Sequence, residues 1–389
     1  MAIADYLAKL SDLRISLKSI LSAKGVDTDG KNTLSELVPL VEDVSGGGAV
    51  TNPIEKALYR FGVLSDIHLK DTAYGEDAES MYDTADSLND YIRALTFFKN
   101  NGADFVGIPG DIVANSRGTN SDEASIKEWL SEIQLFRQYN DTYFPGKPVY
   151  ATTGNHDACP YGYCTGKSGI NMDLVIPKTV YGDGTMLAED VWADVVGRPI
   201  RYTFEQGDDV FIFLPMYYWN YINFYRDEDE DWIKEQLETY KDKRVFLFFH
   251  IPLNGTYDIG MGTDGLDGER TTGAVSRFVP LIRSYPNVIW FTGHSHFNLW
   301  REGSIQPDGA TPYVNPNTYQ SGESMTMIHC PSCAFIRDKN AAGSTIRDYP
   351  GSQGLLVDVF ADRVIIKGID FTQGDGGAFI PKATYVVNG

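Results

Sequence analysis

The sequence predicts an α/β protein in which strands alternate with helices, preceded by a small helical module. Three observations support this prediction. Leucine and isoleucine recur at helical spacing near the N-terminus, and a run of glycines follows them. Further on, short apolar segments alternate with amphipathic ones, which favours a parallel sheet with right-handed crossovers. Several of the apolar segments end in Asp, Asn or His residues, and strand ends are where open α/β sheets build their sites.

Residues 1–45 are predicted to form the helical module. Apolar residues recur at helical spacing over residues 2–23, and Gly25 is placed to end that helix. A second short helix is expected to follow. Residues 46–56 begin with glycines and are a predicted linker to the main domain, residues 57–389. Because two short helices bury little apolar surface alone, we expect the module to mediate attachment to a partner or homo-oligomerisation.

Two short motifs occur within this module. Asp27–Gly30 with Glu36 has part of the spacing of a calcium-binding loop, but Gly25 takes its first ligand position and has no side-chain ligand, so we reject a calcium site. The leucine spacing, Lys24–Val26 and Thr33–Leu37 resemble the small N-terminal modules of phage tail and baseplate proteins. That resemblance implies docking to a tail or baseplate protein.

Five apolar segments of the main domain are predicted strands, and polar residues able to bind a cation follow each of them. These are Phe61–Leu64 with Asp66 and His68, Phe105–Ile108 with Gly110 and Asp111, Pro148–Thr153 with Gly154, Asn155, His156 and Asp157, Val245–Phe249 with His250, and Val288–Phe291 with His294 and His296. Five of the six histidines lie in these stretches. One such histidine alone would be an ordinary turn residue, but five at strand ends indicate a shared site.

The other segments predict helices and further strands. Amphipathic spacing predicts helices over residues 80–100 and 121–139, and one that begins at the acidic run 227–231. We interpret that run as favourable charge at a helix N-terminus and not as a metal site. Strands are expected in a hairpin over residues 204–214 and in a second sheet, over residues 325–328, 355–360 and 364–369.

The four cysteines form two close pairs, Cys159 with Cys164 and Cys330 with Cys333. Such pairs are compatible with two disulfides, with free thiols or with a structural zinc. The first pair is widely spaced for a zinc knuckle, so disulfides or thiols fit better.

Four residues are weaker candidates for contacts with a substrate. Asn115 follows the second strand-end stretch and is equally suited to capping a loop. His329 lies outside the five stretches and either lines the site or has a core or turn role. Tyr217 and Trp219 belong to an aromatic run, residues 216–225. This run forms either a wall for a sugar, base or polyol chain, or packing in the core or between subunits.

The order D-x-H, G-D, G-N-H-[DE], H, G-H-x-H resembles the calcineurin-like metallophosphoesterase family, over about residues 61–297. The resemblance implies a four-layer fold, with two stacked mixed β-sheets flanked by helices. It also implies a dinuclear metal centre, with Asp66, His68 and His296 on one ion, Asn155, His250 and His294 on the second, and Asp111 bridging the two. His156 would face the scissile phosphate.

The chemistry that the resemblance implies is phosphate ester hydrolysis, most simply of a diester, by in-line attack of a metal-bridging hydroxide. Two divalent ions about 3.5–4 Å apart hold the phosphate and lower the pKa of bound water. Mixed imidazole and carboxylate ligands suit Mn, Fe, Zn or Ni better than Mg or Ca. His156 would stabilise the transition state or protonate the leaving oxygen, and Asp157 would orient His156 or a neighbouring ligand.

Charge and hydropathy restrict the partners and the location. The net charge of −20 over 389 residues disfavours binding to nucleic-acid duplexes or anionic membranes. No apolar run is long enough to span a bilayer, and the N-terminus lacks the features of a secretory signal. We therefore expect a virion-associated protein if the N-terminal resemblance holds, and a cytoplasmic one otherwise.

Three functional hypotheses follow. The first is a phosphodiesterase carried on a phage tail that cleaves a surface polymer such as teichoic acid. The second is a cytoplasmic phosphodiesterase or phosphatase for nucleotides. The third is a structural or receptor-binding tail protein on a phosphoesterase scaffold. Every expected ligand is present, which argues against the third.

Overall fold

The computed structural model describes residues 56–71, 73, 84–114, 122–158, 170–217, 225–252, 275–299, 326–339, 345–348, 351–374 and 376–388, and the single positions 14, 18 and 33. Contacts divide the chain into two units, Met1–Lys56 and Ala57–Gly389. The predicted N-terminal helices lie outside the described residues, except for the helical positions Arg14 and Lys18. The glycine linker, Asn115, Trp219, Cys159 and Cys164 also lie outside them.

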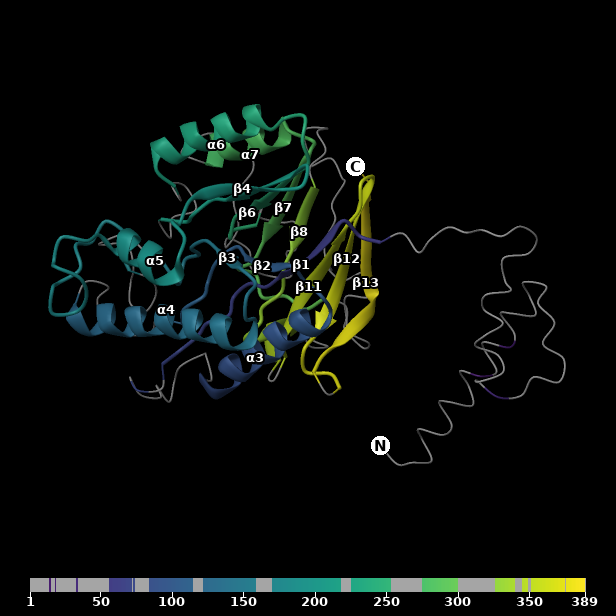
Figure 1. The fold of residues 1–389 in the computed structure, drawn as a ribbon, viewed down its shortest axis with the longest axis horizontal. Coiled ribbons are helices and arrows are strands. Elements are labelled where there is room, and N and C mark those ends of the chain that lie inside the picture. Colours follow the sequence, from purple (N-terminus) through teal and green to yellow (C-terminus); the bar gives the residue numbers. More distant parts are fainter. Residues whose placement is uncertain are drawn as a thin grey trace. The chain divides into compact units, whose positions relative to one another are not determined.

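Two β-sheets lie at the centre of the second unit (Figure 1). The first has the strand order β13-β12-β11-β1-β2-β3 and the second the order β4-β5-β6-β7-β8. A separate two-stranded sheet pairs β9 with β10. The strands are β1 Tyr59–Val63, β2 Phe105–Ile108, β3 Val149–Ala151, β4 Tyr202–Gln206, β5 Asp209–Phe213, β6 Val245–Phe248, β7 Val288–Thr292, β8 Thr326–His329, β9 Ile336–Lys339, β10 Thr345–Asp348, β11 Gln353–Val359, β12 Arg363–Asp370 and β13 Ala378–Asn388.

Both main sheets are mixed. Strands β1, β2 and β3 run parallel, as do β5 through β8, whereas β11 pairs antiparallel with β1 and β4 forms the predicted hairpin with β5. The prediction that the three late strands share one second sheet is wrong. Only β8 joins the sheet of β7, while β11 and β12 extend the first sheet beside β1. Their apolar pattern shows that they are buried but does not specify a partner strand.

The helices are α3 Thr84–Asn100, α4 Glu123–Tyr143, α5 Ala188–Val196, α6 Asp227–Thr239 and α7 Val275–Arg283. In α4, Asp122 caps the first turn by accepting from the Ser125 amide at 2.7 Å. The acidic run begins α6 as predicted, and the buried Asp229 pairs with Arg201. None of the helices among the described residues is long and apolar enough to cross a membrane.

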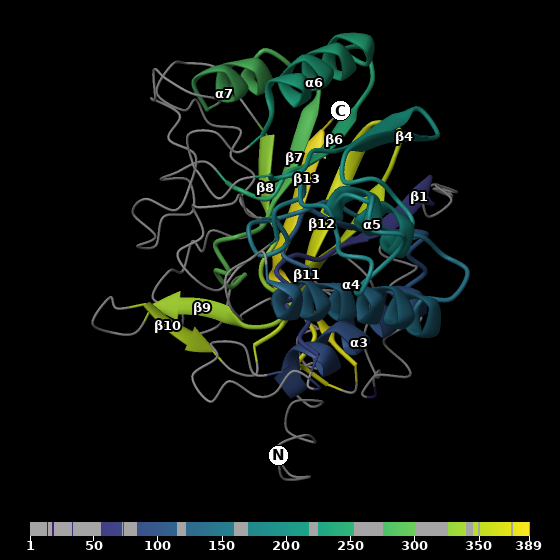
Figure 2. The same ribbon diagram turned by 90° about the vertical axis from the view of Figure 1, so that its left-hand side faces the viewer.

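The helices cover the outer faces of the two sheets. Figures 1 and 2 show α3 and α4 on the side of the first sheet, and α6 and α7 on the side of the second. One buried cluster joins α3 and α4 to the first sheet, and another joins α6 and α7 to the second. A third cluster, rich in phenylalanine, lies between the sheets. The layers are therefore helix, sheet, sheet and helix, as predicted.

Aromatic rings from both sheets form the core between them. The Phe61 ring of β1 lies 5.1 Å from the Phe105 ring in its own sheet, and 5.3 Å from the Phe211 and Phe246 rings in the other. The next residue, Gly62, faces the opposite side, where a Cβ atom would lie 2.7 Å from the Phe98 ring of α3. Successive residues of a strand face opposite sides of the sheet. Strand β1 therefore contacts the core between the sheets through Phe61 and the helix α3 through Gly62.

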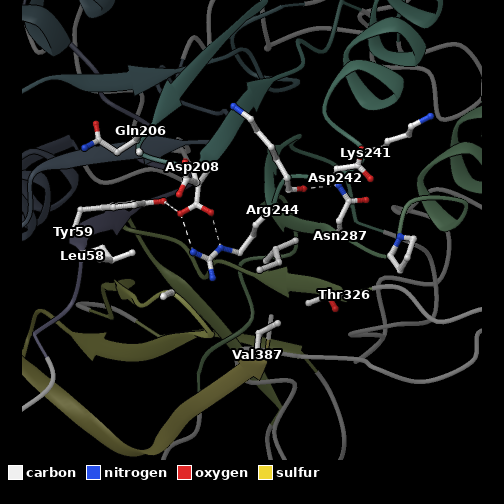
Figure 3. Close-up of a pocket in the computed structure, with 16 residues that line it drawn as sticks. Leu58, Tyr59, Gln206, Asp208, Lys241, Asp242, Arg244, Asn287, Thr326 and Val387 are labelled. Carbon is white, nitrogen blue, oxygen red and sulfur yellow. Dashed lines mark hydrogen bonds and ion pairs between the residues drawn. The ribbon is translucent and has the colours of Figure 1, made fainter. Parts of the chain in front are cut away.

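A cavity of about 880 Å³ lies where several of these strands begin (Figure 3). In its wall, Tyr59 at the start of β1 donates to Asp209 at 2.5 Å, and Arg244 donates to both Asp209 oxygens at 2.8 Å. Arg244 also donates to the Phe360 carbonyl at 3.0 Å. Because Tyr59 and Phe360 flank strands of the first sheet and Asp209 begins a strand of the second, this ion pair joins the two sheets at the end remote from the polar strand ends.

Candidate metal centre

All seven predicted metal ligands lie at the carboxyl ends of parallel strands. Asp66 and His68 follow β1, Asp111 follows β2 and Asn155 follows β3 in the first sheet, while His250 follows β6, and His294 and His296 follow β7, in the second. These seven side chains are buried. The two sheets therefore supply ligands to one place from opposite sides.

The first group joins Asp66, His68 and His296, with Asp111 as its fourth member. Asp66 Oδ1 lies 2.9 Å from His296 Nε2 and 4.0 Å from His68 Nε2, and the two Nε2 atoms are 3.2 Å apart. Two imidazole nitrogens and a carboxylate oxygen in this arrangement could all be ligands of one cation.

The second group joins Asp111, His250 and His294, with Asn155 beside them. His250 Nε2 lies 3.1 Å from Asp111 Oδ2, and His294 Nδ1 lies 2.8 Å from Asn155 Oδ1. Asp111 belongs to both groups, and within each group one ligand atom per Asp or His residue lies within 4.8 Å of the others. The geometry therefore allows Asp111 to bridge two cations.

The backbone at these positions is strained. Among the described residues, the non-glycine residues with positive φ are Asp66, His68, Asp111, His294 and His296, with φ between 50° and 68°. Side chains with a Cβ rarely adopt this conformation, and each instance costs about 1–3 kcal/mol. All five are predicted ligands, and such strain typically concentrates at functional sites.

Two glycines allow the ligands to approach closely. A Cβ atom on Gly154 would lie 2.2 Å from Asp111 Oδ1, and one on Gly293 would lie 2.6 Å from Asp66 Oδ2. Both contacts are shorter than any real Cβ contact, so larger residues at these positions would displace the carboxylates.

Burial and charge leave most of the donors in the forms that a metal requires. Burial lowers the pKa of His68 and His296, and lowers that of His294 to about 3, so these rings are neutral. Burial opposes ionisation of Asp66, but His296 and His250 bring its pKa well below the usual value. Neutral imidazoles, ionised carboxylates and an amide oxygen are donors that divalent transition metals accept, so the residues present fit two such ions.

His156 is the one half-exposed side chain among the predicted catalytic and ligand residues. Its backbone amide donates to Asp111 Oδ1 at 2.8 Å, and its ring Nδ1 lies 3.2 Å from the Ala114 carbonyl oxygen. The ring packs edge-on against His68, with centroids 4.6 Å apart. His156 thus lies beside both groups with its ring at the solvent side.

Asp157 is fully buried and accepts from four backbone amides. Its Oδ2 accepts from Asp111 at 2.7 Å and Gly154 at 2.8 Å, and its Oδ1 accepts from Ile112 at 2.9 Å and Val113 at 3.0 Å. Burial raises its pKa to about 7, with Asp111 adding to the rise, while the amides lower it. Only the ionised carboxylate can accept from all four. Asp157 therefore fixes the loop of a neighbouring predicted ligand, Asp111. The His156 ring contacts the Ala114 carbonyl and not Asp157.

Residues 59–298 match the calcineurin-like phosphoesterase family. The chain belongs to this family. Its two buried groups of Asp and His residues are consistent with a site for two metal ions.

Two similar proteins are distant from this chain in sequence. A dimetal phosphatase from Danio rerio has a similar fold, with a TM-score of 0.51 at 12% identity over 86% of this chain and 99% of that one. Sphingomyelin phosphodiesterase 2 of Caenorhabditis elegans is 21% identical over 215 residues, which are 50% of this chain and 32% of that protein. The matched part thus spans about a third of the length of that relative. The first comparison confirms the phosphoesterase fold of two mixed sheets flanked by helices.

The weaker candidates have packed environments where the structure describes them. His329 is completely buried, with Nε2 2.9 Å from the Phe297 carbonyl oxygen. Tyr217 is 5% exposed, and the Arg226 guanidinium lies 3.7 Å above its ring. These are contacts of packed side chains, so a direct role in substrate binding stays a prediction for both.

Cys330 and Cys333 are free, buried thiols. Cys330 belongs to the cluster between the sheets, and Cys333 to the cluster under α3 and α4. The two thiols pack in different layers, and no disulfide joins them.

The first testable property concerns protons released on metal binding. Burial opposes a charge on His250, but Asp111 and Asp66 raise its pKa to about 9. In the metal-free protein His250 is therefore protonated below that pH, and a metal must displace its proton. We expect about one proton per chain to leave as His250 becomes a ligand at pH 7, and the affinity of that ion to rise as the pH approaches 9. Calorimetric titration with Mn²⁺ in two buffers of different ionisation enthalpy measures this number, and a value near zero would contradict the expectation.

A second prediction concerns Asp157→Asn. An amide at this position offers only one oxygen, so at least two of the four backbone N–H groups lose their acceptor and face an NH₂ group. Each buried orphan donor costs about 1–3 kcal/mol. Because burial raises the pKa of Asp157 to about 7, its ionised form itself costs stability at neutral pH, and loss of the charge offsets part of the effect. The free energy of unfolding at pH 7 should therefore fall by about 1–2 kcal/mol. Urea denaturation of the metal-free proteins tests this. Unchanged stability would show that the carboxylate charge at Asp157 is not needed to hold the loop.

Proposed function

We propose that this chain is a phosphodiesterase, with two divalent metal ions held by the two buried groups. The observation that carries the proposal is the arrangement of Asp111, which belongs to both groups, beside the half-exposed His156. Asp66, His68 and His296 would hold one ion, and Asn155, His250 and His294 the other. When bound, such a pair of ions supplies charge for the phosphate oxygens and a nucleophile at neutral pH.

The side chains of the protein have three separate tasks in this proposal. The buried carboxylates and imidazoles of both sheets would hold the two ions, whose charge would attract the phosphate. Asp157 fixes the Asp111 loop through the four amides. His156 would protonate the leaving oxygen: in its imidazolium form Nδ1–H would donate to the Ala114 carbonyl, and Nε2–H would pass its proton to the leaving oxygen. Protonating an alkoxide as it leaves removes a large part of the barrier to ester cleavage.

A diester is the favoured substrate class. The distant relative from Caenorhabditis elegans is named as a phosphodiesterase, and this supports the diester within a family of phosphoesterases. A diester also carries a single negative charge on its phosphate, which suits a chain with a net charge of −20 better than a monoester does.

Hydrolysis of bis-p-nitrophenyl phosphate and of p-nitrophenyl phosphate in Mn²⁺ tests the proposal. We expect turnover of the diester, with the monoester slower. Faster turnover of the monoester would assign a phosphatase instead. Absence of turnover with both esters in protein that holds two Mn²⁺ would contradict the proposed activity and favour the scaffold hypothesis.

A phage-tail role and a wall polymer such as teichoic acid as substrate are finer proposals. They rest on the sequence of residues 1–45, and support for them comes from that resemblance alone. Teichoic acid is a phosphodiester polymer, so the chemistry is compatible with the site. The test is release of soluble phosphodiester fragments from purified wall polymer, compared with turnover of nucleotide diesters. Cleavage of nucleotide diesters alone would favour the second hypothesis from the sequence.

A further inference from the structure

Residues 329–337 form a short segment that lies against two loops of the first metal group, the loop of Asp66 and the loop of His296. We call this segment the clasp. It is outside residues 59–298, which match the phosphoesterase family, so the family pattern assigns it no role. It begins at the last residue of β8 and ends in β9.

The clasp holds the loop of Asp66 through the backbone. Ser332 is completely buried, and its hydroxyl donates to the Asp66 carbonyl at 3.0 Å. The Ala334 amide donates to the same carbonyl at 3.2 Å, and the Cys333 amide donates to the Ser65 carbonyl at 2.9 Å. The Ser332 oxygen also accepts from the Ala334 and Phe335 amides, both at 3.1 Å, which fixes its own turn. Three donors therefore fix the backbone of a ligand residue in the left-handed region.

The clasp also holds the loop of His296. Buried His329 has its Nε2 2.9 Å from the Phe297 carbonyl oxygen, and Ser295 Oγ lies 3.3 Å from its Nδ1. The assignment that satisfies both contacts has Nε2–H donating to Phe297 and Ser295 donating to Nδ1. Further along, the Arg337 amide donates to the His296 carbonyl at 2.7 Å.

A ring of the clasp fills the space between these two loops. Phe335 is completely buried, with its centroid 4.4 Å from that of His296 and 6.0 Å from that of His68. His68 belongs to the first sheet and His296 to the second. Phe335 thus packs against imidazoles from both sheets.

We propose that Ser332 and His329 are positioning residues that set the metal affinity of the first group, Asp66, His68 and His296, and leave the second group unaffected. The inference rests on the ligand assignment of the proposed function. The left-handed conformations of Asp66, His68 and His296 cost free energy, and the contacts of the clasp offset that cost before a metal binds. Losing such outer contacts typically weakens metal binding by about 10–100-fold.

The experiment is calorimetric titration of metal-free, full-length protein with Mn²⁺. Asp66→Asn and His250→Gln, measured first, identify which binding phase belongs to which group. We expect Ser332→Ala and His329→Leu to weaken the first-group phase about 10–100-fold, without change in the second. His329→Gln keeps a donor for the Phe297 carbonyl and should restore most of the affinity.

Tyr59→Phe is the matched control, because it removes a buried hydroxyl hydrogen bond at the opposite end of the sheets. It should lower stability and leave both binding phases unchanged. Equal weakening of both phases in the clasp variants, unchanged affinity in them, or weakening by Tyr59→Phe would each overturn the inference. Wild-type protein that binds fewer than two Mn²⁺ would overturn the ligand assignment as well, which separates that failure from the failure of the clasp alone.

Discussion

Replacing Asp111 by asparagine is expected to abolish diester hydrolysis, by about 10³-fold or more, and to reduce the metal content from two ions to at most one. Asp111 is the single residue shared by the two buried groups, and its Oδ2 is 3.1 Å from His250 Nε2. An amide has one neutral oxygen in place of a charged carboxylate, so it cannot bridge two cations. Metal analysis and turnover of bis-p-nitrophenyl phosphate measure the two effects on the same sample.

Asp358→Asn provides the control for loss of a buried carboxylate. Asp358 is 3% exposed and pairs with Arg60 and Lys367 on β1 and β12, and it belongs to neither metal-binding group. This variant should lose stability but keep both ions and the activity. Two bound ions in Asp111→Asn would contradict the bridging role.

His156→Ala is expected to lower kcat about 10²–10⁴-fold for diesters with alkyl leaving groups, with both metal ions retained. The hydrogen bond that His156 makes to Asp111 comes from its backbone amide, so the substitution preserves it. An alkoxide needs a proton as it leaves, whereas p-nitrophenolate needs little. The loss should therefore be much smaller for a p-nitrophenyl diester, and comparing leaving groups in wild type and variant measures this difference.

A loss of equal size for every leaving group would show that His156 stabilises the phosphate charge and does not deliver a proton. If the His156→Ala variant loses a metal ion, the role of His156 is instead to support the position of His68, whose ring it contacts. Metal analysis of the variant therefore accompanies the kinetic comparison.

The local pattern of the sequence was sufficient to predict that the polar strand ends meet at one place. Each ligand stretch follows an apolar run that forms a buried strand, and parallel strands bring their carboxyl ends to one edge. The hairpin of β4 and β5 and the helix at the acidic run were predicted for the same reason, because turn residues and period are local signals. The family resemblance supplied the four-layer arrangement.

Relations between distant segments could not be predicted in this way. Strand β11 pairs with β1 about 290 residues earlier in the chain, as Leu356 with Gly62, and an apolar run carries no information on its partner. Ser332 and Phe335 follow no spacing rule that would connect them to Asp66 or His68. The four amides around Asp157 could not be predicted, because the sequence does not show which backbone groups a side chain contacts.

The left-handed conformation of five ligands has a consequence for how this chain could change over time. Glycine or asparagine would relax the backbone at each of these positions. Substitutions that abolish the metal centre would therefore relieve backbone strain, whereas most substitutions in a core lower the stability of the fold. A descendant freed from catalysis would drift toward glycine and asparagine at positions 66, 68, 111, 294 and 296.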